Sequence, residues 1–252
     1  MTTWANEIDK IKRFFWPSKE EWKALIIMTL AFAFIFSFNE WGTDSFDLSM
    51  GLKNFSIAFI IAGISVFIHE AGHRIMALKF GFRAETKLWW YGIIIGIVLT
   101  IITGGKLVFL AAHGIFIHQL STHRLGYFRY GPNILVFGLI SLMGPLCNIF
   151  FATIIKTADV WFGAGLTNVP FFAKLFIFNW ILAAWNLLPI PPLDGSRMLF
   201  YSRMWYAFIF GAIGSYVILV YLFGIYSYFI AIALGAIIWL IYYLTVERKI
   251  KP

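Results

Sequence analysis

The chain has 252 residues, of which 61% are hydrophobic, 20% aromatic and only 13% charged, whereas about 25% of the residues of an average soluble domain are charged. This composition excludes a sizeable soluble domain and indicates an integral membrane protein. The formal net charge is +8, but the Lys and Arg residues are scattered between apolar segments rather than gathered on one face, which argues against nucleic acid as a partner.

Apolar runs close to the roughly 20 residues needed to cross a bilayer recur along most of the chain. We expect a cytoplasmic N-terminal segment over residues 1–22, followed by one integral-membrane domain over residues 23–252. The first apolar run has no convincing small-residue cleavage site at its end, which indicates an uncleaved anchor. The sequence therefore predicts an all-α polytopic fold with about six transmembrane helices. Their predicted positions are 23–38, 56–79, 133–155, 171–188, 205–223 and 227–246.

Residues 91–117 are also apolar, but Gly104, Gly105 and Lys106 divide them into two short halves. Neither half is long enough to span a bilayer comfortably. We therefore predict a re-entrant element between the second and third crossings, which enters and leaves by one face or crosses twice. Its second half, residues 106–117, is rich in Val, Phe and Ile, and this pattern fits a strand of a β-hairpin as well as a short helix.

The distribution of charge predicts the orientation of the chain, because Lys and Arg collect in cytoplasmic loops. Basic residues are frequent before the first crossing, whereas the loop after it carries Glu40, Asp44 and Asp47 against one Lys53. With a re-entrant element in place, every later basic cluster falls on the side of the N-terminus. We therefore expect a protein of the cell membrane with both termini facing the cytoplasm, and lipid as a partner.

The stretch HEAGH, His69 to His73, places ionisable side chains near the end of the second predicted crossing. His69 and His73 are four residues apart, so a helix brings both imidazoles to one face. Glu70 lies about 100° around the helix from His69, where it can reach a water without ligating a metal. This pattern is typical of two zinc ligands and a general base. It also occurs by chance, but ionisable residues inside a membrane crossing are usually functional.

A catalytic zinc ion usually has three protein ligands, so a third must come from elsewhere in the chain. Cys147 is the only cysteine, so the candidates are His113, His118, His123, Asp159 and Asp194. Asp194 follows an apolar helix that runs into three prolines, which cannot continue it. An unwound chain at the membrane edge favours a polar pocket. The alternative is a helix-ending turn with Asp194 as a solvated turn residue.

The two stretches HEAGH, at His69 to His73, and NLLPIPPLDG, at Asn186 to Gly195, resemble the two motifs of the site-2 protease family of intramembrane zinc metalloproteases. The resemblance covers a catalytic core over about residues 56–203 and leaves the helices over 205–246 as additions. Ser196 stands where the family often has a second glycine, a difference that removes no ligand. The expected enzyme is a minimal core type without a PDZ or cystathionine-synthase-like (CBS) domain.

The resemblance implies that His69, His73 and Asp194 hold Zn²⁺ and that Glu70 is the catalytic residue that activates water. Asn186 is predicted to donate to the developing oxyanion or to hold the substrate backbone. A buried Asn that satisfies helix carbonyls is an equal alternative for this residue.

A third fragment, GPLCN, resembles the small-residue and Asn pattern of the family's intervening core helix. Gly144 would let helices approach closely, and Asn148 would hydrogen-bond across the bundle. Together with Gly195 of the second motif, these residues are predicted to support the site, with plain helix packing as the alternative. The broken segment 91–117 also falls where the family has a membrane-embedded β-hairpin.

The resemblance implies an intramembrane zinc metalloprotease that hydrolyses peptide bonds in or near transmembrane segments of single-pass or other helical membrane proteins, as in regulated intramembrane proteolysis. The active site would face the cytoplasm. Two alternatives stay open: a membrane zinc-binding or transport protein, and a catalytically inactive homologue that binds membrane helices. Glu70 separates a hydrolase from a transporter, because a carboxylate beside the ligands, but not among them, serves hydrolysis.

Overall fold

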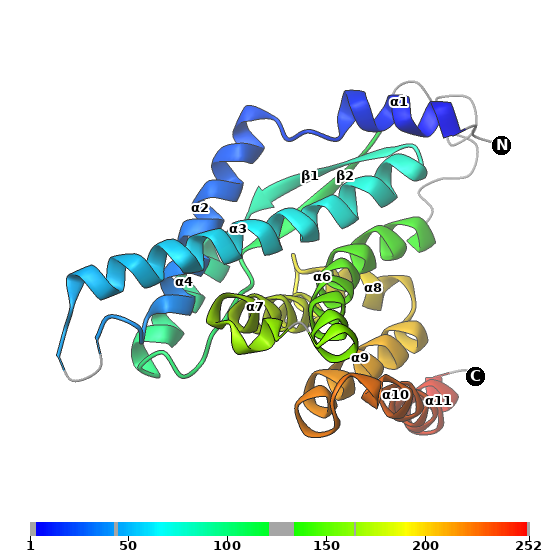
Figure 1. The fold of residues 1–252 in the computed structure, drawn as a ribbon. Coiled ribbons are helices and arrows are strands. Elements are labelled where there is room, and N and C mark those ends of the chain that lie inside the picture. The colour runs from blue at the N-terminus through cyan, green and yellow to red at the C-terminus, as the bar shows by residue number, and fades with distance from the viewer. Residues whose placement is uncertain (1–3, 43–44, 121–133, 164, 251–252) are drawn as a thin grey trace.

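The structure is a computed structural model that describes residues 4–42, 45–120, 134–163 and 165–250, so the candidate ligand His123 lies outside the described residues. It is mostly helical, with one small antiparallel sheet (Figure 1). In chain order the elements are α1 (Trp4–Phe14), α2 (Lys19–Ser37), α3 (Leu48–Lys79), β1 (Phe82–Leu88), α4 (Trp90–Ile102), β2 (His113–Gln119), α6 (Ile134–Phe162), the 3₁₀ turn η2 (Leu166–Asn168), α7 (Pro170–Asn186), α8 (Asp194–Tyr201), α9 (Arg203–Phe223), the 3₁₀ turn η3 (Ile225–Ser227), α10 (Tyr228–Tyr242), the π-helical turn η4 (Tyr243–Glu247) and α11 (Arg248–Ile250).

Four helical stretches among the described residues are long and apolar enough to cross a bilayer: Leu48–Lys79, Ile134–Phe162, Arg203–Val220 and Tyr228–Glu247. They coincide with four of the predicted crossings, and they confirm the prediction of a helical membrane protein. The predicted crossings 23–38 and 171–188 coincide with α2 and α7. Helix α7 has 17 residues, which is slightly shorter than the roughly 20 that a bilayer requires.

Local sequence explains where the principal helices begin and end. Ser18 caps α2 in a capping box with Glu21, and the Asp47 side chain caps α3 by accepting a backbone N–H. Pro170 opens α7, where its missing N–H costs no helical hydrogen bond. Helix α7 ends at Asn186, just before the run of prolines that cannot continue it. The chain then turns and starts α8.

The segment 91–117 divides into a helical and an extended half, as the glycine pair in its middle indicates. Its first half lies in α4, and Gly104 and Gly105 follow with φ of 58° and 74°, backbone angles that only glycine adopts readily. The end of its second half lies in β2, which pairs antiparallel with β1, from Phe82 opposite Gln119 to Leu88 opposite His113. The partner strand therefore precedes the segment, instead of belonging to it.

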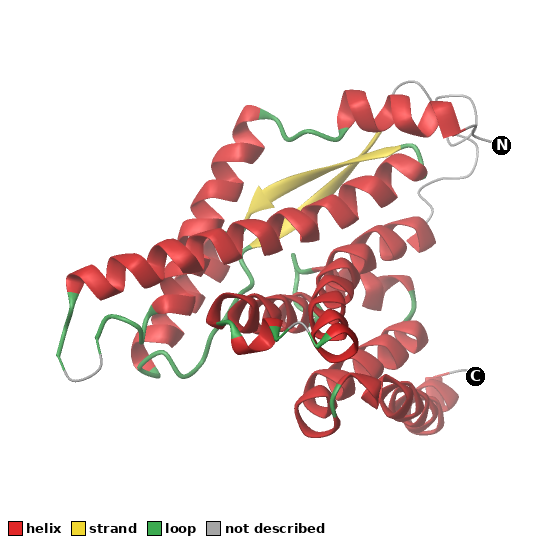
Figure 2. Cartoon of the chain, viewed as in Figure 1, coloured by secondary structure: helices red, strands yellow, loops and turns green. Residues whose placement is uncertain are grey.

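The main hydrophobic core lies where α3 packs against α2 and α7. Its fully buried members include Met28 and Phe32 from α2, Ile61 from α3 and Phe178 from α7. Helix α3 also contacts α6 and strand β1, and Figure 2 shows the two strands in yellow alongside α3. The helix that carries HEAGH is therefore covered by other elements along much of its length.

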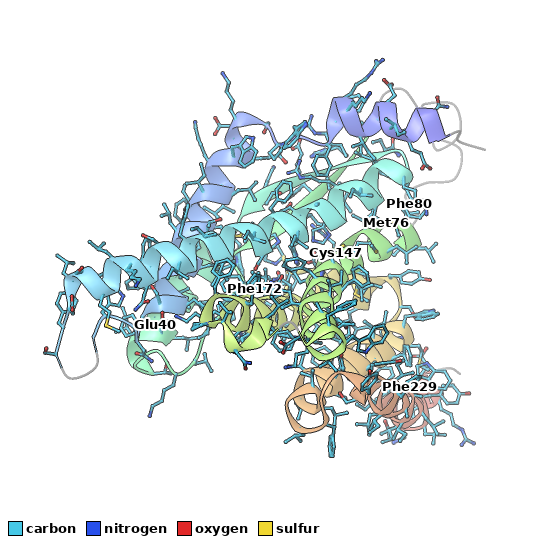
Figure 3. The ribbon with its side chains drawn as sticks, in the orientation of Figure 1. Glu40, Met76, Phe80, Cys147, Phe172 and Phe229 are labelled. Carbon is cyan, nitrogen blue, oxygen red and sulfur yellow. The ribbon has the colours of Figure 1, made fainter. Side chains whose placement is uncertain are left out.

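Helices α3 and α6 approach each other closely at Gly72. An added Cβ there would lie 2.6 Å from the carbonyl oxygen of Met143 and 2.7 Å from the sulfur of Cys147, which Figure 3 shows on α6 next to α3. Only a glycine fits this contact without moving α6, because the nearest atom belongs to the backbone. The close approach brings the polar face of α3 within reach of α6.

Helices α9 and α10 pack chiefly on each other and turn many apolar side chains outward. Phe229 of α10, for example, is 66% exposed (Figure 3). Contiguous apolar surface of this kind is a liability in water, whereas it is the ordinary outer surface of a helix in lipid.

Candidate metal centre

The HEAGH stretch lies inside the continuous helix α3, so its two histidines do fall on one face. Their imidazole ring centroids are 4.7 Å apart. His69 and His73 are 0% exposed and Glu70 is 3% exposed. Burying three ionisable side chains together is costly unless they find polar partners or a metal, so the partners of these groups identify what the site is built to do.

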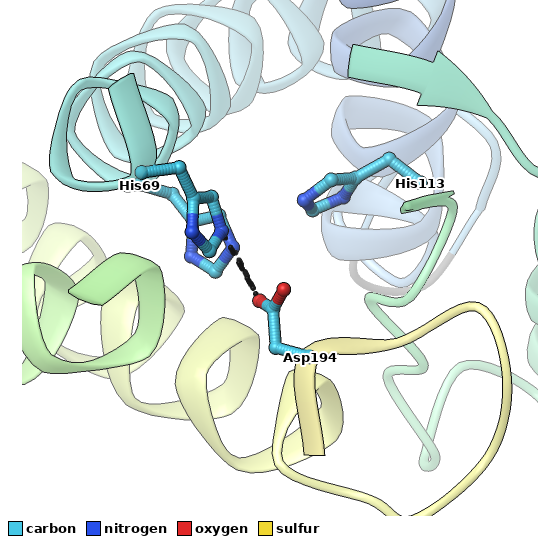
Figure 4. Close-up of side chains that lie close together, drawn as sticks. His69, His113 and Asp194 are labelled. Carbon is cyan, nitrogen blue, oxygen red and sulfur yellow. Dashed lines mark hydrogen bonds and ion pairs between the residues drawn. The ribbon is translucent and has the colours of Figure 1, made fainter. Parts of the chain in front are cut away.

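Asp194 is the first residue of α8 and reaches the same point from the opposite direction. Its Oδ2 lies 3.1 Å from Nε2 of His69 and 3.2 Å from Nε2 of His73. Figure 4 shows the carboxylate of Asp194 facing the imidazole of His69. Asp194 is 2% exposed, so the alternative of a solvated turn residue is wrong. The structure thus brings together the three residues that the sequence proposes as metal ligands.

Hydrogen bonds on the far side of each imidazole orient its ring. Nδ1 of His69 donates to Oδ1 of Asn148 at 2.6 Å, and Nδ1 of His73 donates to the carbonyl oxygen of Ile140 at 2.8 Å. Each ring thereby turns its Nε2 atom toward Asp194. Histidines that ligate metals almost always donate their other N–H to such an acceptor.

The buried side chain of Asn148 is itself fixed by two hydrogen bonds. Its Nδ2 donates to the Ser65 carbonyl at 2.9 Å and to Oδ1 of Asn179 at 2.7 Å. The amide therefore points its oxygen at His69.

Two glycines predicted to support the site are required by close packing. A Cβ on Gly144 would collide with Nε2 of His73 and would also press on His69. A Cβ on Gly195 would collide with the carbonyl group of Leu187. Gly144 therefore leaves the space beside the imidazole nitrogens open, and Gly195 lets the turn before α8 fold tightly enough to place its carboxylate.

His113, at the start of β2, is a fourth buried group at the same point. One candidate ligand atom from each of His69, His73, His113 and Asp194 lies within 4.8 Å of the others. The ring centroids of His113 and His69 are 5.0 Å apart, and Nε2 of His113 is 3.4 Å from Oε1 of Glu70. The sequence presents His113 only as one candidate among several for a third ligand, whereas the structure places it beside Asp194.

The other described candidates lie away from this group. His118 is at the far end of β2, where its exposed ring lies 3.2 Å from Glu85. Asp159 is near the end of α6 and lies 3.3 Å from Lys156. Neither belongs to the buried group that can hold a metal.

A buried polar network holds the Oε2 atom of Glu70. Oε2 of Glu70 accepts a hydrogen bond from the hydroxyl of Thr86 in β1. Arg74, one helical turn after Glu70, donates to that hydroxyl at 3.2 Å and to Glu21 of α2 at 2.6 Å. The position of Arg74 four residues after Glu70 is a signal that sequence reasoning could have used. Nothing local points to Glu21 or Thr86.

Asn186 is buried at the end of α7, and its amide serves the packing of the chain. Its Nδ2 donates to the carbonyl of Leu182 at 2.8 Å and faces that of Leu110 at 3.5 Å. Both N–H groups are thus directed at protein carbonyls, as in the alternative given above for this residue. The oxyanion role of Asn186 stays a prediction.

The site fits a zinc ion for two reasons: the types of its donor atoms, and the lack of hydrogen-bond partners for several of them. Four buried atoms have no hydrogen-bond partner among the residues that the structure describes: Nε2 of His73, Oε1 of Glu70 and both ring nitrogens of His113. Buried polar atoms are rarely left in this state unless they have a further partner. Two imidazoles and a carboxylate form a common donor set for catalytic zinc.

The electrostatics of the groups outside the spanning helices agree with this donor set. Burial by itself would raise the pKa of Asp194, but the imidazoles of His73 and His69 hold it well below its usual range, so this residue is a carboxylate. Burial lowers the pKa of His113 to about 4, against the opposing pull of Glu70, so its ring is neutral at physiological pH.

Comparison with known proteins gives two relatives, both from Methanocaldococcus jannaschii. One, provisionally named a zinc metalloprotease, is 31% identical over 199 residues, which cover 78% of this chain and 90% of the relative. Another, named a zinc metalloprotease, is 24% identical over 144 residues, which cover 57% of this chain but only 33% of the relative. No family model matches the chain, and no solved structure matches it significantly.

Proposed function

Because this chain belongs to the zinc metalloprotease family of its M. jannaschii relatives, we propose that it is an intramembrane protease of the site-2 type. Its substrates would be membrane proteins cut in or near a transmembrane helix. The observation that carries this proposal is the convergence of a buried Asp194 on the two histidines of α3, since α3 is itself long and apolar enough to cross a bilayer.

Zinc is the cofactor, as the family and the buried His and Asp group support. We assign His69, His73 and Asp194 as its ligands. The Nδ1 hydrogen bond of each imidazole, to an acceptor on α6, turns the Nε2 atom of that ring toward the Asp194 carboxylate. Bound zinc would polarise a substrate carbonyl and lower the pKa of a water molecule toward about 7.

Glu70 is the residue we assign as the general base and acid. Its Oε2 accepts a hydrogen bond from Thr86, whereas its Oε1 has no hydrogen-bond partner among the described residues and lies 3.4 Å from Nε2 of His113. Glu70 takes a proton from the attacking water, whose oxygen bonds to the carbonyl carbon, and delivers that proton to the amide nitrogen as the C–N bond breaks. The products are a carboxylic acid, which holds the second proton of the water, and an amine; at neutral pH they ionise to a carboxylate and an ammonium group.

Strand β2 offers a surface on which an unwound substrate segment can be held. It pairs with β1 on one side, and among the described residues no strand pairs with its other edge. There the Ile115 carbonyl accepts a hydrogen bond from Arg197. A cavity of about 240 Å³ lies next to this edge, lined by Phe116, Ile117, Ile134, Phe137, Arg197 and Phe200. A peptide added to the edge would replace the Arg197 contact and place an apolar side chain in the cavity.

Replacing Ile117 by Pro is expected to abolish cleavage of a membrane substrate without lowering the zinc content. Successive residues of a strand direct their N–H and C=O groups to opposite edges, so Ile117 shares with Ile115 the edge that faces away from β1. Proline removes this N–H and leaves the ladder to β1 in place. Ile117→Ala is the matched control, because it shortens the side chain but keeps the donor. Equal cleavage by the proline and alanine variants would rule out strand addition here.

We propose that residues 23–38 and 171–188 also cross the membrane, that 91–117 is re-entrant, and that the site faces the cytoplasm. Charge distribution supports this orientation, because basic residues then gather on one side of the membrane. Labelling of single cysteines introduced before α2 and after η4, in intact cells and in inverted vesicles of a Cys147→Ala background, would measure it directly.

The proposed function is tested with reporters that carry one apolar helix of about 20 residues with a central helix-breaking Asn-Gly pair. We expect the purified protein to cut such reporters in or near the helix, as mass spectrometry of the fragments would show. A chelator such as 1,10-phenanthroline should stop cleavage, and added Zn²⁺ should restore it. Zinc-loaded protein that leaves a broad panel of these reporters intact would argue for the transporter or the inactive homologue.

A further inference from the structure

His113 belongs to the buried group of His69, His73, His113 and Asp194, and it is the one member of this group that the proposed function does not use. Its ring is 2% exposed, and neither ring nitrogen has a hydrogen-bond partner in the part of the chain that the structure describes. We propose that His113 is a catalytic residue that donates a hydrogen bond to the oxygen of the scissile carbonyl as that oxygen gains negative charge. This inference rests on the proposed function.

The surroundings of His113 differ from those of the ligands. His69 and His73 each donate Nδ1 to a fixed acceptor on α6, which leaves Nε2 as the metal-facing atom. No acceptor within the described ranges holds either nitrogen of His113. Since ligating histidines almost always have this second partner, and three protein ligands already make a catalytic zinc site, His113 is better suited to contact the substrate.

The ring of His113 is aimed at the place where hydrolysis would occur. Figure 4 shows it pointing toward His69 and Asp194 from the other side of the group. Its Nε2 lies 3.4 Å from Oε1 of Glu70, the atom that would take the proton of the attacking water. A carbonyl attacked at this place would have its oxygen within reach of the same ring.

The backbone around His113 holds the ring in this direction. His113 pairs with Leu88 at the end of the sheet, and the next residue before it, Ala112, accepts a hydrogen bond from the Trp89 N–H at 2.7 Å. Ile115, two residues on and therefore on the same face of the strand, is buried in a cluster with Ala77 of α3. The face of β2 that carries His113 thus packs toward α3.

The developing oxyanion needs a hydrogen-bond donor, and His113 has one to give. Glu70 acts as an acceptor at the start of the reaction, and both N–H groups of Asn186 are directed at the carbonyls of Leu182 and Leu110. An imidazole carries at least one N–H in either protonation state, and among the described residues no acceptor holds that of His113. Removal of one oxyanion donor typically lowers kcat by about 10²- to 10³-fold.

The test compares His113→Leu, which has no donor, and His113→Gln, which keeps an N–H donor, using the helix reporters described above. We expect His113→Leu to lower kcat by about 100-fold or more, with KM and zinc content close to those of the unsubstituted protein, and His113→Gln to recover part of the loss. The matched control is His118→Leu, on the same strand but exposed and paired with Glu85, which should cleave normally.

A second measurement separates stabilisation of the transition state from a merely structural role. A phosphinate analogue of the cleaved peptide should bind His113→Leu more weakly in proportion to the loss of kcat/KM, because such analogues report transition-state binding. An uncleaved ground-state peptide should bind as before. Unchanged affinity for the phosphinate would overturn the proposal, as would unchanged kcat.

Loss of zinc from a folded His113→Leu protein would also overturn the proposal, since it would make His113 a ligand. Zinc content is measured by atomic absorption after dialysis, and folding is checked by thermal melting in the same detergent. Failure of the unsubstituted, zinc-loaded protein to cut any reporter would instead contradict the proposed function itself. Cleavage that is equal in the unsubstituted and His113→Leu proteins would contradict only the role of His113.

Discussion

Glu70→Gln should retain zinc and lose cleavage, with kcat lower by about 10²- to 10⁴-fold, the usual contribution of a general acid–base residue. A carboxamide has nearly the shape of a carboxylate but cannot accept the proton of the attacking water. Its oxygen can still accept the hydrogen bond from Thr86, so the fold of the site should survive. The measurement is single-turnover cleavage of a helix reporter, with zinc determined on the same sample.

Glu85→Gln is the matched control for this substitution. Glu85 lies on β1, next to Thr86, but its side chain is 34% exposed and pairs with Arg83 and His118 at the surface. We expect cleavage and zinc content to stay normal in this variant. A Glu70→Gln protein that cuts at the unsubstituted rate would remove Glu70 as the base. A protein that transports zinc, and cuts nothing with or without Glu70, would support the transporter alternative.

Asp194→Ala should release zinc and therefore abolish cleavage. Asp194 is the only carboxylate within 3.2 Å of both Nε2 atoms among the described residues, so its loss leaves two imidazoles to hold the ion. Loss of a hydrogen-bonding partner behind a ligand typically costs about 10- to 100-fold in metal affinity, and we expect the loss of a ligand to cost more. Competition with a zinc-binding dye measures the affinity.

Asp159→Ala is a matched control, because Asp159 is another candidate that the sequence offers for the third ligand, and it lies away from the site beside Lys156. It should keep its zinc and its activity. Asp194→Asn provides a second variant of nearly native shape, in case the alanine protein does not fold. A folded Asp194→Ala protein that holds zinc with unchanged affinity would contradict the proposed ligand set.

Much of the site could be predicted because its first part is local in the chain. Residues four apart on a helix share a face whatever the rest of the protein does. The HEAGH motif alone therefore predicts that His69 and His73 lie on one face of the helix and that Glu70 lies to one side of them. The prolines before Asp194 forced the chain out of α7 in the same local way. That Asp194 belongs with the histidines came from the resemblance of the two motifs to one family.

Local sequence also determined the broad class of the fold. Long apolar runs gave α3, α6, α9 and α10, because a helix satisfies its own backbone hydrogen bonds within the segment. The Gly104 and Gly105 pair marked the end of α4. The sequence could not decide whether the following residues form a strand, because a strand needs a partner elsewhere in the chain. That partner, β1, was not predicted.

Only the tertiary structure decided what surrounds the three proposed ligands and the proposed base. Glu21 reaches Arg74 from α2, Thr86 reaches Glu70 from β1, and His113 arrives from β2. Each of these contacts joins segments that are distant in the chain, so it depends on how α2, α3 and the sheet pack rather than on a helical repeat. The sequence on its own therefore determined which residues are proposed to bind the metal, and the packing determined which side chains hold them and brought His113 to the same point.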